Sequence, residues 1–153
     1  MNTSGQIRTA LPAALLVSGL RNGEILAKLM PPGCTLSQTG PDAFAFVMKR
    51  KFGPVELALP GTILIVSQGA QHQMTFHGAH LLFGKADMAL SITLSEANKA
   101  TVLEYTGTLQ ASGLAGRLLS RVNEKTVNER VHKGFVSFKT LVTAARETGA
   151  PGA

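Results

Sequence analysis

The period of the hydrophobic residues in the larger part of the chain changes from two to a helical value near residue 114, and this change constrains the fold more than any other feature. Between residues 34 and 111, apolar side chains recur at every second position, as in Phe44, Phe46 and Met48, and turn residues interrupt the run. This alternation predicts strands joined by tight turns in an antiparallel meander. From residue 114 to residue 147 the apolar residues follow a helical period, which predicts one long amphipathic helix.

Shorter elements precede the strands. Residues 6–11 predict a first strand, and residues 13–20 and 24–30 predict two short helices. Asn22 is suited to cap the second of these helices, because its side chain can accept from the first free backbone N–H groups. The chain has 153 residues, which is an ordinary length for one domain. We assign residues 6–147 to a single domain and expect residues 1–5 and 148–153 to be disordered ends.

The order of these elements predicts how they pack. One helix cannot cover both faces of a large sheet, whereas a sheet that curls around the helix buries its concave face against the apolar stripe of that helix. We therefore expect an α+β fold, in which a curved antiparallel sheet wraps around the long C-terminal helix and the two short helices close one end. The polar residues 123–132 leave open whether the final helix is interrupted. Gly134, inside that helix, indicates close packing against a neighbour.

Large and flexible apolar residues are expected where the sheet and the long helix face each other. Methionine adapts to irregular space and to variable ligands, so this composition favours a ligand cavity, with a dry and filled core as the alternative. The candidate ligand-cavity residues are Phe46, Met48, Leu57, Leu59, Met74, Phe76, Met88, Leu90, Ile92, Tyr105, Phe135 and Phe138.

The formal charge of +6 favours an anionic partner. Lys49, Arg50 and Lys51 form a basic cluster beside a predicted turn, and they are the candidate membrane or partner surface. An anionic lipid surface or an acidic protein surface would suit them, while ordinary solvated surface is the alternative. Nucleic acid is not expected as a partner, because the chain has no recognition motif, no Trp and one Tyr.

A series of short motifs along residues 10–145 carries a resemblance to a known family. The motifs are Glu24-Ile25-Leu26, Pro32-Gly33-Cys34, Gly53-Pro54-Val55, Gly61, Gly78, Gly84-Lys85-Ala86 and the pair Phe135 and Phe138. With them the chain resembles the CoxG family of carbon monoxide dehydrogenase subunits. This family is part of the START-like (SRPBCC) helix-grip superfamily, which includes lipid carriers and polyketide cyclases.

The resemblance implies an accessory protein. It would bind a hydrophobic small molecule, a lipid or a quinone, in an internal cavity and help recruit or serve a carbon monoxide dehydrogenase-type molybdenum hydroxylase at the membrane. No other cofactor is implied. Cys34 is the single cysteine, and neither a signal peptide nor an apolar run of roughly 20 residues is present. We therefore expect a cytoplasmic protein with peripheral contact at the inner face of the cell membrane.

The sequence shows little sign of catalysis or metal binding. A metal site needs three or four convergent ligands, and His72 and His80 share the inward parity of Met74 without such company, while His77 should face solvent. We assign no catalytic residue and no metal ligand. The alternative is a polyketide cyclase- or dehydratase-like enzyme, which would use Tyr105, His72 or His80 on a hydrophobic substrate in the same cavity.

Overall fold

A computed structural model describes residues 1–82 and 84–147, with all side chains in these ranges except those of Arg50 and Phe52. Within these ranges the chain forms seven strands and four helices. In chain order the elements are β1 (Asn2–Thr9), α1 (Ala13–Leu20), α2 (Gly23–Leu29), β2 (Cys34–Gly40), β3 (Ala43–Phe52), β4 (Val55–Gln68), β5 (Gln71–His80), β6 (Gly84–Ala97), β7 (Ala100–Ser112), α3 (Gly113–Leu119) and α4 (Glu124–Glu147).

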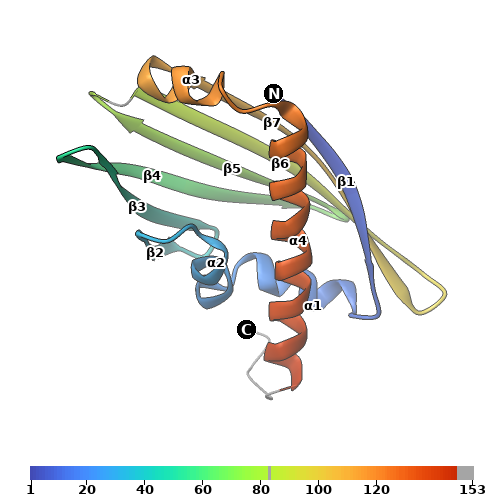
Figure 1. The fold of residues 1–153 in the computed structure, drawn as a ribbon. Helices are drawn as coiled ribbons and strands as arrows, with labels where there is room; N and C mark the ends of the chain where they lie inside the picture. Colours follow the sequence, from blue (N-terminus) through green and yellow to red (C-terminus); the bar gives the residue numbers. More distant parts are fainter. Residues whose placement is uncertain (83, 148–153) are drawn as a thin grey trace.

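The strands of the described residues form one antiparallel sheet in the order β1-β7-β6-β5-β4-β3-β2. Strands β2 to β7 make the expected meander, and β1 joins the far edge beside β7. The sheet curves around α4, with α1 and α2 at one end and α3 across the other (Figure 1). The expected α+β fold, a curved antiparallel sheet around a long C-terminal helix, is therefore confirmed.

Local chemistry sets the ends of the short helices. The Asn22 side chain accepts from the backbone N–H groups of Glu24 (2.9 Å) and Ile25 (3.3 Å), which caps α2 as predicted. The first helix receives a distant carboxylate, since Glu96 Oε1 at the end of β6 accepts from Ala13 N at 2.8 Å. This contact ties α1 to the sheet.

The N-terminal residues 1–5 were expected to be disordered, and this prediction is wrong. β1 begins at Asn2, and its register pairs Asn2 with Thr108 and Gly5 with Tyr105. Position 5 requires a glycine for a steric reason, because a Cβ atom there would collide with the Tyr105 hydroxyl. The other predicted disordered end, residues 148–153, lies outside the described residues.

The C-terminal helical region is interrupted at residues 120–123, between α3 and α4. Asn123 Oδ1 accepts from Thr126 N at 2.8 Å, so Asn123, the first of the polar residues 123–132, caps the start of a new helix. From Glu124 onward α4 is continuous through that stretch and reaches Glu147.

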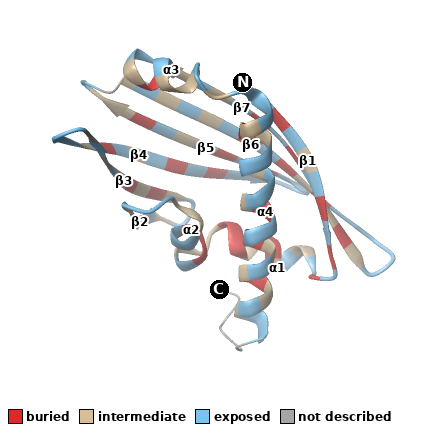
Figure 2. Ribbon diagram, viewed as in Figure 1, coloured by how far each residue is buried: buried red, intermediate tan, exposed pale blue. Residues whose placement is uncertain are grey.

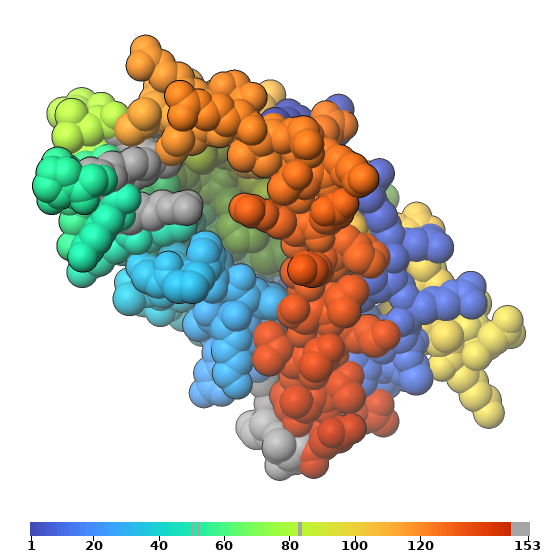
Figure 3. Space-filling model, viewed as in Figure 1, coloured from blue at the N-terminus to red at the C-terminus, as the bar shows by residue number. Residues whose placement is uncertain are grey.

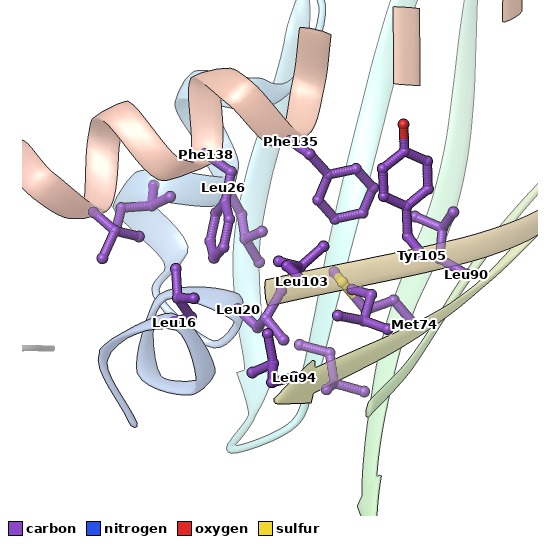
Figure 4. Packing of buried hydrophobic residues seen from close by; sticks show 14 of the residues in the cluster. Leu16, Leu20, Leu26, Met74, Leu90, Leu94, Leu103, Tyr105, Phe135 and Phe138 are labelled. Atoms are coloured by element: carbon purple, nitrogen blue, oxygen red, sulfur yellow. The ribbon is translucent and has the colours of Figure 1, made fainter. Parts of the chain in front are cut away.

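The core lies between the concave face of the sheet and the inner face of α4 (Figure 2). The side chains of Phe44, Ile63, Ile92 and Leu103 are at most 1% exposed. The close-up in Figure 4 shows Phe135 and Phe138 of α4 directed toward Met74, Leu26 and Leu103 from the other elements.

Two glycines differ in what surrounds them. A Cβ atom on Gly19 of α1 would lie 2.8 Å from Val142 Cγ2, so this glycine allows α1 and α4 to approach closely. A Cβ atom on Gly134 of α4 would meet nothing within 4 Å. The expectation that Gly134 packs closely against a neighbour is therefore wrong, and the space beside it belongs to a pocket.

Candidate functional site

An apolar pocket of about 390 Å³ lies between the sheet, α2 and α4. Figure 3 shows the molecule hollowed here, with α4 on one side, the α2–β2 segment on the other and central strands at the back. Its described lining comes from four strands, from α1 and α2 with the segment that follows, and from α4. The lining residues are Leu20, Leu26, Leu29, Met30, Pro31, Phe46, Met48, Ile63, Met74, Phe76, Met88, Leu90, Arg130, Val131, Gly134, Phe135 and Phe138.

The strands bring the floor of the pocket together through their register. Phe76 lies opposite Met88, and Met74 lies opposite Leu90, on neighbouring strands. Because side chains alternate between the faces of a strand, residues paired in this way share the concave face. Met74 and Leu90 are buried while Met88 is half-buried, so part of this floor borders open space.

The helices form the walls. Leu26 and Leu29 of α2 face the pocket from one side, and Phe135 and Phe138 of α4 face it from the other. Gly134 stands between the α4 contributions and leaves the wall without a side chain. The pocket is widened at this point because α4 has no Cβ atom there.

Most of the predicted cavity residues lie together in this lining. They are Phe46, Met48, Met74, Phe76, Met88, Leu90, Phe135 and Phe138. The remaining four, Leu57, Leu59, Ile92 and Tyr105, were also expected there but lie outside the described lining. Ile92 is completely buried in the core, Leu57 lies nearer the β3–β4 turn, and Leu59 lies over Gly78 of β5.

Nine residues of the described lining were not among the predicted cavity residues. They are Leu20, Leu26, Leu29, Met30, Pro31, Ile63, Arg130, Val131 and Gly134. Ile63 lies in the continuous apolar run 63–66, where the sequence pattern alone does not show which side chains point inward. Arg130 lies four residues before Gly134 and therefore on the same side of α4. It was not predicted to line the pocket because it is charged and belongs to the polar residues 123–132.

Tyr105 is part of an aromatic contact beside the pocket. Its ring stacks on that of Phe135 with centroids 4.2 Å apart (Figure 4), and its hydroxyl lies 3.1 Å from His132 Nδ1. Burial raises the pKa of Tyr105 above the usual value. The phenol is therefore kept neutral and faces the start of α4.

His72 belongs to a chain of polar contacts near the β4–β5 turn. Its Nδ1 lies 2.6 Å from Ser67 Oγ, which accepts a hydrogen bond of 2.7 Å from Arg21 Nη2. Arg21 Nε in turn donates to Asp42 Oδ1 at 2.5 Å. Burial, together with the positive charge of Arg21, lowers the pKa of His72. These contacts hold the turn between α1 and α2 against β4 and β5.

None of the three histidines on the strands is among the described residues that line the pocket. His72 points inward and is 3% exposed, and His77 is exposed and contacts Asp87, both as predicted. His80 is half-buried and its Nδ1 accepts from Leu82 N at 3.0 Å. Tyr105, His72 and His80 therefore do not converge on the described lining of the pocket.

The thiol of Cys34 is half-buried at the start of β2. Burial raises its pKa, which lowers the thiolate fraction and with it the nucleophilic character of this residue.

The predicted basic cluster lies at the end of β3. Lys49 and Lys51 are exposed, and Lys51 is paired in register with the acidic Glu56 of β4. The side chain of Arg50 lies outside the described side chains. Two lysines thus present positive charge near the β3–β4 turn.

The described residues contain neither a group of metal ligands nor a helix suited to span a membrane. Across residues 1–82 and 84–147, no three His, Cys, Asp or Glu side chains are grouped so that they could hold a metal ion. In the same part of the chain, none of the helices combines the length and the apolar character that crossing a bilayer requires. A larger hollow of about 560 Å³ lies along β1, the central strands and the start of α4, but Thr, Ser, Asn and Gln dominate its lining.

Comparisons with solved structures bear on the fold. A conserved protein from Geobacillus kaustophilus has 18% sequence identity and a TM-score of 0.71, with 95% of this chain and 97% of that chain covered. Human STARD10 has 14% identity and a TM-score of 0.61, with 95% and 64% covered. Ara h 8.0201 has 12% identity and a TM-score of 0.60, with 94% and 98% covered. At these identities the likeness concerns the fold alone.

The comparison with protein families shows which family the chain belongs to. No curated protein matches the sequence. The model of the CoxG family of carbon monoxide dehydrogenase subunits matches residues 5–143, which is nearly the whole chain. The chain therefore belongs to the CoxG family and has the helix-grip fold of its START-like structural neighbours.

Proposed function

We propose that this protein is a non-catalytic accessory protein that holds one apolar ligand, a lipid or a quinone, in the pocket between the sheet and α4. In this role it serves a carbon monoxide dehydrogenase-type molybdenum hydroxylase at the cytoplasmic face of the membrane.

The observation that carries the proposal is the nearly complete apolar lining of an open pocket. A volume of about 390 Å³ lies within the roughly 300–1,000 Å³ usual for small-molecule sites. Met48, Met74 and Met88 line it, and flexible thioether side chains can adjust to ligands of different shape. Each CH₂ group that a ligand buries contributes roughly 0.8 kcal/mol, so a short alkyl or isoprenoid chain suffices for useful affinity.

The placement of the polar groups supports a carrier over an enzyme. Tyr105, His72 and His80, which an enzyme of the cyclase type would use, lie outside the described lining. A general acid or base must come within hydrogen-bonding distance of the reacting group. Apart from Arg130, whose guanidinium stays protonated, the side chains of the described lining have no group that could act as an acid or a base.

The partner enzyme is inferred from the family, and contact with the membrane from the family and from exposed basic residues. Membership in the CoxG family favours a molybdenum hydroxylase of the carbon monoxide dehydrogenase type as the partner. Exposed Lys49 and Lys51 supply charge suited to anionic lipid, at about 1 kcal/mol for each basic residue near such a surface.

The proposal is tested by native mass spectrometry of the purified protein after incubation with short-chain quinones and lipids. The variant Met88→Trp places an indole in the pocket. Its control is Leu64→Trp, because Leu64 is 51% exposed on the outer face of β4 and lies outside the described lining.

We expect mass adducts with the unaltered protein and with Leu64→Trp, and none with Met88→Trp, while all three retain the same circular dichroism spectrum. Adducts that survive in Met88→Trp would place binding elsewhere and overturn the proposal. Turnover of a bound substrate by the purified protein would favour the enzyme alternative.

A further inference from the structure

We propose that the pocket selects an amphiphile with an anionic head group, a carboxylate or a phosphate, and that Arg130 binds this head group at the pocket mouth. The inference rests on the proposed function, since it names the class of ligand for the same pocket. Arg130 is the one charged residue among the described residues that line the pocket.

The exposure of the lining residues distinguishes the closed end of the pocket from its mouth. Ile63, Phe138 and Leu20 are at most 3% exposed, so they mark its closed end. Arg130 and Pro31 are exposed and mark the mouth, between α4 and the end of α2. A ligand with one polar end therefore gains most when its chain points toward Phe138 and its head group remains beside Arg130.

The charge of Arg130 is not neutralised by its surroundings. Within the described residues it makes neither a hydrogen bond nor an ion pair. Its neighbours three and four positions away on α4 are Thr126, Val127, Lys133 and Gly134, which supply no carboxylate. Residues at these spacings are the ones that meet on a helix surface. Arg130 is thus, among the residues described, a cation without an internal partner, and Lys133 adds a second positive charge nearby.

The chemistry of the guanidinium favours an anion over a neutral head group. Arginine offers several donors in a planar fork that matches a carboxylate or phosphate, and charge-assisted hydrogen bonds are about twice as strong as neutral ones. The rest of the described lining offers a polar head group nothing to bind, because it consists of apolar side chains and a glycine. The volume of about 390 Å³ is near the lower end of the usual roughly 300–1,000 Å³, which suits one chain better than two.

The test measures the affinities of decanoate, decyl phosphate and decanol by isothermal titration calorimetry, below their micelle-forming concentrations. Arg130→Gln removes the proposed contact. Arg121→Gln is the matched control, because Arg121 is exposed, precedes α4 and lies outside the described lining. Both variants lose one positive charge by the same substitution.

We expect the unaltered protein and Arg121→Gln to bind at least one of the two anions roughly three- to ten-fold more tightly than decanol, as for a charge-assisted contact at a partly exposed site. Arg130→Gln should lose this preference and keep its affinity for decanol. The better of the two anions identifies the head group. Equal binding of anions and decanol, or the same loss in both variants, would overturn the inference and leave the pocket as the apolar site. If none of the three probes bound the unaltered protein, this inference would fail, whereas the proposed function would be decided by the mass adducts with quinones and lipids described above.

Discussion

Replacing Gly134 by leucine tests the pocket from the side of the helix. A glycine in a helix interior costs about 0.8–1.0 kcal/mol relative to alanine, and leucine is nearly as good a helix former as alanine. A Cβ atom at this position meets nothing within 4 Å and Gly134 lines the pocket, so we expect the new side chain to extend into the pocket. We expect the free energy of unfolding to rise by about 0.5–1 kcal/mol from helix propensity alone, and further if the leucine is buried.

The assay combines thermal unfolding with a binding titration. For a chain of this length 1 kcal/mol corresponds to roughly 2–4 °C in Tm. The affinity for decanol should fall at least ten-fold, because the leucine occupies space that the alkyl chain requires. Ser137→Leu, on the exposed side of α4, is the control and should leave binding unchanged. A destabilised Gly134→Leu, or one that binds decanol normally, would refute the view that Gly134 borders an open pocket.

Three further predictions concern other parts of the molecule. The lowered pKa of His72 means that the unfolded chain takes up a proton near the ordinary pKa of about 6.5, whereas the folded protein takes it up only at lower pH. The free energy of unfolding, measured by urea titration, should therefore be level above pH 7 and fall below about pH 6.5, and His72→Gln should flatten this slope. Tyr105→Phe removes the hydrogen bond to His132 and should cost about 0.5–1.5 kcal/mol in the same assay; no loss would argue against that contact. Changing Lys49 and Lys51 to Ser should reduce sedimentation with anionic vesicles, and added salt should reduce it too; insensitivity to both would exclude a role in membrane attachment.

The alternation of residues along the strands predicted the face of each side chain but not its position along that face. Met74 and Met88 line the pocket as their parity indicates. Leu59 and Tyr105 have inward parity too, yet Leu59 lies over Gly78 of the neighbouring strand and Tyr105 is covered by Phe135. Where α4 crosses the sheet decides these cases, and this depends on long-range packing that no local pattern encodes.

The start of the N-terminal strand was not predicted because its first two inner positions lack apolar side chains. Thr3 and Gly5 occupy them, and Gly5 is needed there because the Tyr105 ring fills the space beneath it. Such a strand resembles a polar, disordered end when the partner strand is unknown. The break before α4 was left open for a related reason, since Asn123 could be solvated or could cap a helix, and only the contact with Thr126 decides between them.

The central claim, that the pocket between the sheet and α4 is the ligand site, is tested most directly by photolabelling with an alkyl diazirine and mapping the modified residues by mass spectrometry. The claim predicts labels on pocket residues such as Met74, Met88 and Phe135, and their suppression by excess decanoate. Labels confined to exposed apolar residues of the outer face, such as Leu64 and Val66, would contradict it.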